Sequence, residues 1–150
     1  MGFALGFESL KAWCQRQSYE FRANAELGQL AIAYRILGED VPLMILPQLA
    51  RGMVMFAMKL PFKAAVERRA AAAESATLLN ASSFMGTWVV NGQTGEIFFR
   101  VTVPALDIEY SDAGLLHVAR VVVGTTEKAA PGWKAVVLEG AAPETAVPKV

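Results

Sequence analysis

The chain has 150 residues, the size of one ordinary domain. Fourteen Lys and Arg balance fourteen Asp and Glu, so the formal net charge is zero, which argues against a nucleic-acid-binding protein. Hydrophobic residues make up 54% and charged residues 19%, a composition opposite to that of a disordered chain. With one cysteine, Cys14, and one histidine, His117, an internal disulfide and a structural zinc site are excluded. We expect no metal and no cofactor.

The N-terminal third predicts a helix followed by a β-hairpin. Apolar residues at Phe3, Phe7, Leu10 and Cys14 follow helical spacing, which predicts a helix that ends near residue 17. Residues 20–27 alternate between polar and apolar, the pattern of a half-buried strand. A glycine turn and a second alternating segment, residues 30–36, complete the hairpin.

The segment from residue 41 to residue 60 is unusually apolar. Residues 41–46 and 52–60 predict two strands, and the second is hydrophobic on both faces. Prolines and an arginine interrupt residues 41–58, so we expect no membrane span there. No signal peptide is recognised at the N-terminus, and we expect a cytoplasmic protein.

Methionines concentrate in these two strands. Methionine adapts its shape and is over-used at promiscuous binding surfaces. One hypothesis is that the cluster forms a partner or self-association surface, with Met53 and Met55 on the second face of the strand. The alternative is that the cluster fills the core beneath a helix. The candidate partner-binding residues are Met44, Met53, Met55, Phe56 and Met58.

The second half predicts a long helix, a hairpin and a further helix. Pro61 is expected to end the strand, and the alanine-rich residues 62–80 predict a helix. Residues 87–90 and 96–103 predict two strands joined by a glycine-containing loop. The elements together predict an α+β fold in which an antiparallel sheet packs against helices.

The C-terminal part predicts one helix from Ser111 or Asp112 to Gly124 and a short last helix opened by Pro131. Residues 141–150 contain two prolines, and we expect a loose tail. Because no linker and no repeat interrupts the chain, residues 1–150 are expected to form a single domain.

A resemblance to a known family accompanies this order of elements. The residues that carry it are Leu79, Asn80, Gly86, Trp88, Thr94, Gly95, Glu96, Phe98, Phe99 and Arg100. They are similar to the corresponding turn and strand residues of YbjN-like proteins, whose fold is that of type III secretion chaperones. The resemblance spans most of the chain, but typical members are more acidic and have a polar segment after the first hairpin. It implies a non-enzymatic, dimeric protein, and secretion chaperones of this fold bind an extended client segment.

Catalysis has weak support in the sequence. Cys14 and His117 could form a thiolate–imidazole pair, but nothing in the sequence brings them together. We therefore predict a protein-interaction module, a chaperone-like adaptor or regulator that acts through apolar surfaces as a homodimer. The alternative is a carrier or sensor of a small apolar molecule, held in a pocket between the sheet and a helix.

Overall fold

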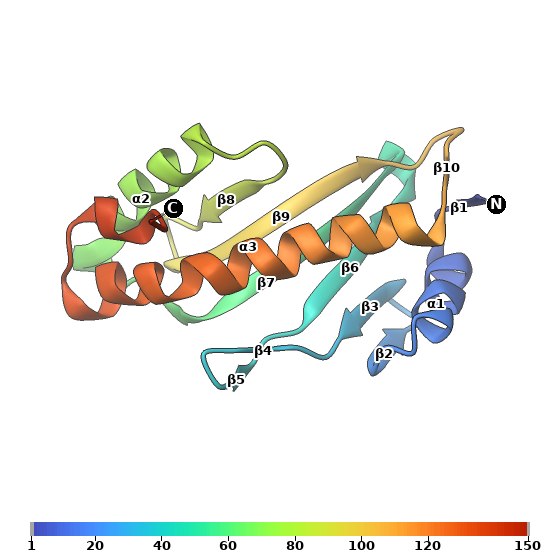
Figure 1. The fold of residues 1–150 in the computed structure, drawn as a ribbon, viewed down its shortest axis with the longest axis horizontal. Helices are drawn as coiled ribbons and strands as arrows, with labels where there is room; N and C mark the ends of the chain where they lie inside the picture. The colour runs from blue at the N-terminus through green and yellow to red at the C-terminus, as the bar shows by residue number, and fades with distance from the viewer. Residues whose placement is uncertain (1, 150) are drawn as a thin grey trace.

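The computed structural model describes residues 2–149 and contains a six-stranded antiparallel sheet with helices packed on it (Figure 1). The strands, in spatial order, are β2 (Phe21–Asn24), β3 (Gln29–Ile32), β6 (Leu43–Gln48), β7 (Met53–Lys63), β9 (Glu96–Pro104) and β8 (Thr87–Val90). The helices are α1 (Phe7–Arg16), α2 (Arg69–Ala81) and α3 (Asp112–Glu139). Two short pairs, β1 (Phe3–Ala4) with β10 (Glu109–Tyr110) and β4 (Arg35–Ile36) with β5 (Glu39–Asp40), lie outside the sheet. The predicted α+β class is confirmed, and so is the predicted antiparallel sheet.

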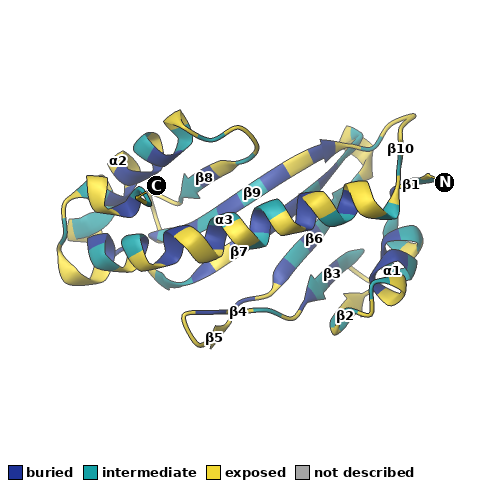
Figure 2. Cartoon of the chain, in the orientation of Figure 1, coloured by how far each residue is buried: buried dark blue, intermediate teal, exposed yellow. Residues whose placement is uncertain are grey.

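One face of the sheet forms the core. Along β7 the fully buried side chains of Val54, Phe56 and Met58 recur with period two, and β9 shows the same alternation (Figure 2). Helix α3 lies across this face and contacts β7 and β9. Helix α2 contacts α3 and the edge strand β8, and α1 is bonded to the start of α3. We call the opposite side of the sheet the outer face.

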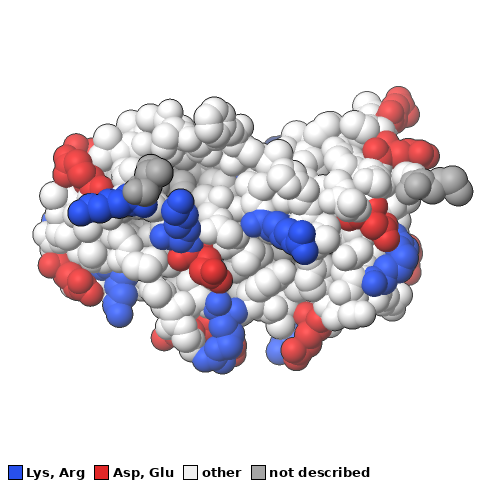
Figure 3. Space-filling model, viewed as in Figure 1, with Lys and Arg blue, Asp and Glu red and all other residues white. Residues whose placement is uncertain are grey.

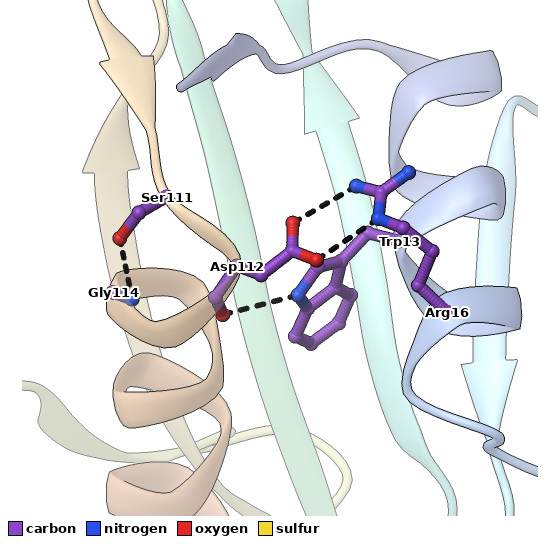
Figure 4. A network of polar contacts seen from close by, with 5 residues as sticks. All are labelled: Trp13, Arg16, Ser111, Asp112 and Gly114. Carbon is purple, nitrogen blue, oxygen red and sulfur yellow. Dashed lines mark hydrogen bonds and ion pairs between the residues drawn. The ribbon is translucent and has the colours of Figure 1, made fainter. Parts of the chain in front are cut away.

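Helix α1 is fixed to the N-terminus of α3 (Figure 4). The Trp13 indole Nε1 donates to the carbonyl oxygen of Asp112 at 3.2 Å, and two nitrogens of Arg16 donate to the Asp112 carboxylate at 2.9 Å. Ser111, one of the two residues expected at the start of this helix, caps α3 by accepting a hydrogen bond from the amide of Gly114. The predicted first helix is too long at its N-terminus, because Phe3 lies in β1 and pairs with Tyr110.

Strand β7 continues through Pro61, which was predicted to end it. The pairing of β7 with β9 shifts between Lys59 and Lys63, and proline is tolerated at such an irregularity because no ladder hydrogen bond is needed there. The prediction of a helix over residues 62–80 is therefore wrong at its start. After β7 the amide of Ala64 donates to the carbonyl oxygen of Gly95, and the short turn η2 (Val66–Arg68) precedes α2.

Helix α3 is one continuous helix of 28 residues, so the prediction of two helices is wrong. Gly124 and Pro131 were expected to end one helix and open another. Both residues are exposed on α3. The carbonyl that loses its partner at Pro131 belongs to Glu127, which is also exposed and accessible to water.

The prediction of a loose tail is wrong for its first half. The turn η3 (Pro143–Ala146) packs against α2 and α3, and the side chain of Ala146 is fully buried. The guanidinium of Arg68 donates to the carbonyl oxygen of Ala141 at 2.7 Å, and the Ser75 hydroxyl donates to that of Pro143 at 3.1 Å. These bonds and the burial of Ala146 hold the first half of the tail against α2 and α3.

Candidate functional site: the outer face of the sheet

The register of the strands builds one row of side chains across the whole outer face. The row is made of Arg22, Ala31, Met44, Ala57, Arg100 and Thr87, one residue from each strand. The small side chains of Ala31 and Ala57 flank Met44. The middle of the row is therefore apolar, and the side chains beside Met44 project little from the sheet. Polar side chains occupy both ends of the row.

Further rows extend the apolar surface in both directions. Leu46, Met55 and Thr102 form the next row, and Met53 stands between Gln48 and Pro104 beyond it. On the other side Lys59 and Phe98 are paired, with Val89 on β8 beside Phe98. We call this surface the apolar strip, defined as Met44, Leu46, Met53, Met55, Ala57 and Phe98. All members except Ala57 are only partly buried.

The five sequence-predicted contact residues are divided between the two faces. Met44, Met53 and Met55 lie on the outer face and belong to the apolar strip. Phe56 and Met58 have no exposed surface, because the period of two turns them toward α3 and into the core. The two hypotheses about the methionine cluster therefore each describe part of it, and Phe56 and Met58 are withdrawn as contact residues.

Charge on the outer face is sparse. Lys59 forms an ion pair with Glu96 at 2.8 Å, and this hydrogen bond, supported by Thr94, holds the pKa of the Glu96 carboxyl below its ordinary range. Arg100 lies next to the apolar strip, and no ion pair within residues 2–149 includes it. Sequence reasoning missed Arg100 as a site residue, because only the strand register shows what surrounds it.

The outer edge of β8 is closed by a side chain. The Asn80 amide donates to the carbonyl oxygen of Trp88 at 3.0 Å and accepts from the amide of Trp88 at 2.8 Å. The side chain thus takes the place of a neighbouring strand and leaves less backbone free for edge pairing. The β8 edge is therefore less available for strand pairing at Trp88.

A surface hollow lies elsewhere, between the end of α2, the loop at residues 82–86 and α3. Its volume is about 530 Å³, and it is lined by Leu79, Phe84, Met85, Trp88 and Val121 among others. It is open to solvent, and Phe84 beside it is fully exposed. The carrier hypothesis placed a pocket between the sheet and a helix, and this surface groove does not support it.

The candidates for chemistry are dispersed. Burial raises the pKa of the Cys14 thiol to about 11, which keeps it protonated at neutral pH, and His117 lies on the exposed side of α3. Within residues 2–149 no group of three or more His, Cys, Asp or Glu side chains is placed to hold a metal ion. On the face that carries α3, positive and negative side chains are interspersed (Figure 3). None of the helices in the described part of the chain has the length and apolarity needed to cross a membrane.

Comparison with known proteins rests on structure alone. No family model and no curated protein matches the sequence. The crystal structure of YbjN from E. coli is similar with a TM-score of 0.66, at 13% identity, over 93% of this chain and 94% of that one. This chain has the YbjN-like fold. The structure of the HopA1–SchA chaperone–effector complex is also matched, with a TM-score of 0.43 and 16% identity, over 77% of this chain and 92% of that one.

The YbjN-like fold confirms the fold that the resemblance implied, and the structure shows what the residues that carried it do. Leu79 and Trp88 are buried in the core, and Asn80 bonds the edge strand. Gly95 has a positive φ of 79°, and a Cβ there would overlap the carbonyl oxygen of Ala64. These residues specify turns and packing, whereas Arg100 lies on the outer face.

Proposed function

We propose that this chain is a non-enzymatic protein-interaction module, a chaperone-like adaptor or regulator that docks its partner on the outer face of the sheet. One observation carries the proposal. Met44, Met55 and Phe98 lie on three neighbouring strands of an apolar surface, and no element within residues 2–149 covers it.

The size of the surface supports a docking role. With about 4.8 Å between strands and about 3.3 Å per residue, the three strands that carry the strip present roughly 330 Å² over about seven residues each. Contiguous apolar patches of a few hundred Å² on a monomer are commonly functional. Methionines give such a surface the ability to repack against more than one partner.

The character of the remaining groups agrees with a binding role. The buried Cys14 thiol has a raised pKa, and the carboxylates of Asp112 and Glu96 are engaged in ion pairs. The homodimer and the cytoplasmic location expected from the sequence remain predictions. The same holds for the absence of enzymatic activity.

A double substitution on the outer face tests the proposal. Met53→Glu with Met55→Glu places two carboxylates on the apolar strip. A matched control, Val66→Glu with Leu138→Glu, adds the same charge at positions that are 72% and 55% exposed and outside the strip. Affinity capture from a lysate of the native organism should yield a stoichiometric protein with the wild-type chain and the control, and lose it with the outer-face variant.

Circular dichroism and a thermal melt first establish that each variant is folded. Capture of the same protein by all three chains would contradict docking on the outer face. A reproducible small apolar molecule in the extract, without a protein, would favour the carrier hypothesis.

A further inference from the structure

Arg100 is a cation beside the apolar strip, and it forms no ion pair within residues 2–149. Arg100 lies between Ala57 and Thr87 in its row and between Phe98 and Thr102 along β9. A partner that covers both Met55 and Phe98 therefore also covers Arg100. The side chain is already partly buried by its neighbours.

Burying this guanidinium without a counter-charge is unfavourable. A charge taken out of water loses its hydration free energy. Only an ion pair with good hydrogen bonds compensates for that loss. Within residues 2–149 the nearest carboxylate on the same strand and face is Glu96, and it is bonded to Lys59. Glu20 adjoins β2 at the far end of the sheet, and β2 is four strands from β9. The counter-charge for Arg100 must come from the partner.

A second copy of the chain does not fit this requirement. A second outer face brings another Arg100 and, beside the strip, another Glu96 that is already paired. Two apolar strips packed together would pair Arg100 only where the β2–β3 turn, whose Glu26 lines a hollow with Met44, lies over β9 of the other copy. Homodimerisation through this face is disfavoured by the charge arrangement.

We infer that the occupant of the outer face is an apolar segment of another protein that carries an Asp or Glu, and that this carboxylate pairs with Arg100. The planar guanidinium favours a carboxylate because it offers two parallel hydrogen bonds. The inference rests on the proposed function and adds the chemistry of the partner to it. Arg100 is then the residue that sets specificity, and the methionines supply adaptable apolar contact.

Selection from a random twelve-residue peptide library displayed on phage tests the inference without a known partner. The full-length chain is used as wild type and as Arg100→Glu, Met55→Glu and the control Leu138→Glu. Wild type and control should enrich apolar peptides that contain Asp or Glu, Arg100→Glu should enrich apolar peptides that contain Lys or Arg, and Met55→Glu should enrich none of these.

Fluorescence anisotropy measures how much the peptide carboxylate contributes to affinity. One enriched peptide is synthesised with Glu and with Gln at its acidic position. Wild type should bind the Glu form about fivefold more tightly than the Gln form, as for a partly exposed ion pair. The variant Arg100→Gln should bind both forms equally.

The outcomes separate the inference from the proposed function. Apolar peptides enriched without charge preference, and lost only in Met55→Glu, would overturn the inference and leave outer-face docking intact. Peptides that Met55→Glu still binds, or no enrichment on the folded wild type, would overturn both. A concentration-dependent dimer that Met55→Glu abolishes and Arg100→Glu strengthens would make a second copy the occupant and overturn the inference.

Discussion

The ion pair between Arg16 and Asp112 joins two helices whose starts are 105 positions apart in the chain. The hydrogen bond from Arg16 lowers the pKa of the Asp112 carboxyl below its ordinary value of about 3.9. A group whose pKa is lower in the folded state contributes stability above its unfolded pKa. That contribution is lost as the pH falls through the folded pKa.

We therefore expect Asp112→Asn to lose less stability than wild type when the pH falls below about 4. Urea unfolding between pH 7 and pH 2.5 measures the free energy for both chains. The asparagine leaves the backbone carbonyl of residue 112 in place for the Trp13 indole. Glu96, whose pKa is also lowered, is present in both chains and cancels in the difference. Identical pH profiles would show that the Arg16 bond does not stabilise the fold.

Single residues also show where sequence reasoning reaches its limit. Period-two alternation predicted that Met53 and Met55 share a face, and the structure places both of them on the outer face. The same alternation removes Phe56 and Met58 from that face, but the sequence-based proposal treated the run as one unit. Arg100 could not be recognised, because its neighbours come from strands whose order periodicity does not give.

At the scale of elements, tertiary packing outweighs the tendency of glycine and proline to end a helix or a strand. Gly124 and Pro131 end helices in many sequences, yet α3 continues through both because its buried face packs on the sheet along its length. Pro61 stays within β7 because the ladder to β9 is interrupted there. Each error comes from a contact between segments far apart in the chain, which residue propensity does not contain.

Two glycines of α3 provide a matched test of this packing. A Cβ on Gly124 would meet nothing within 4 Å, whereas on Gly132 it would lie 2.5 Å from the carbonyl oxygen of Thr145 and 2.9 Å from the Cα of Ala146. Gly124→Ala should stabilise the protein by about 1 kcal/mol through helix propensity. Gly132→Ala gains the same propensity but displaces the backbone of η3, and should destabilise by about 1–3 kcal/mol.

Urea denaturation of the two variants and wild type measures both changes. A stabilisation of equal size in both would show that η3 is not packed against Gly132. The truncated chain that ends at residue 140 serves as the control. In it, Gly132→Ala should become as stabilising as Gly124→Ala, because the backbone that it would displace is gone.

The molecule as a whole combines a zero net charge with one uncovered apolar face. Both features lower the solubility of the free chain, because net charge does not repel its copies and apolar surface is exposed to water. The unusual apolar content of residues 41–58 is explained by strands that are apolar on their core side and on the outer face alike. A sheet covered on one side needs only one apolar face for folding, so the second set is available for a partner.

A solubility measurement distinguishes the effect of the zero net charge from the effect of the uncovered apolar face. Met53→Glu with Met55→Glu and the control Val66→Glu with Leu138→Glu each add two carboxylates, which moves the formal net charge from zero to −2. If charge alone governs association, both variants gain solubility equally in ammonium sulfate precipitation. We expect the outer-face variant to gain several-fold more, because it also interrupts the apolar strip. Equal gains would place the associating surface elsewhere, with the exposed Phe84 beside the surface groove as the next position to substitute.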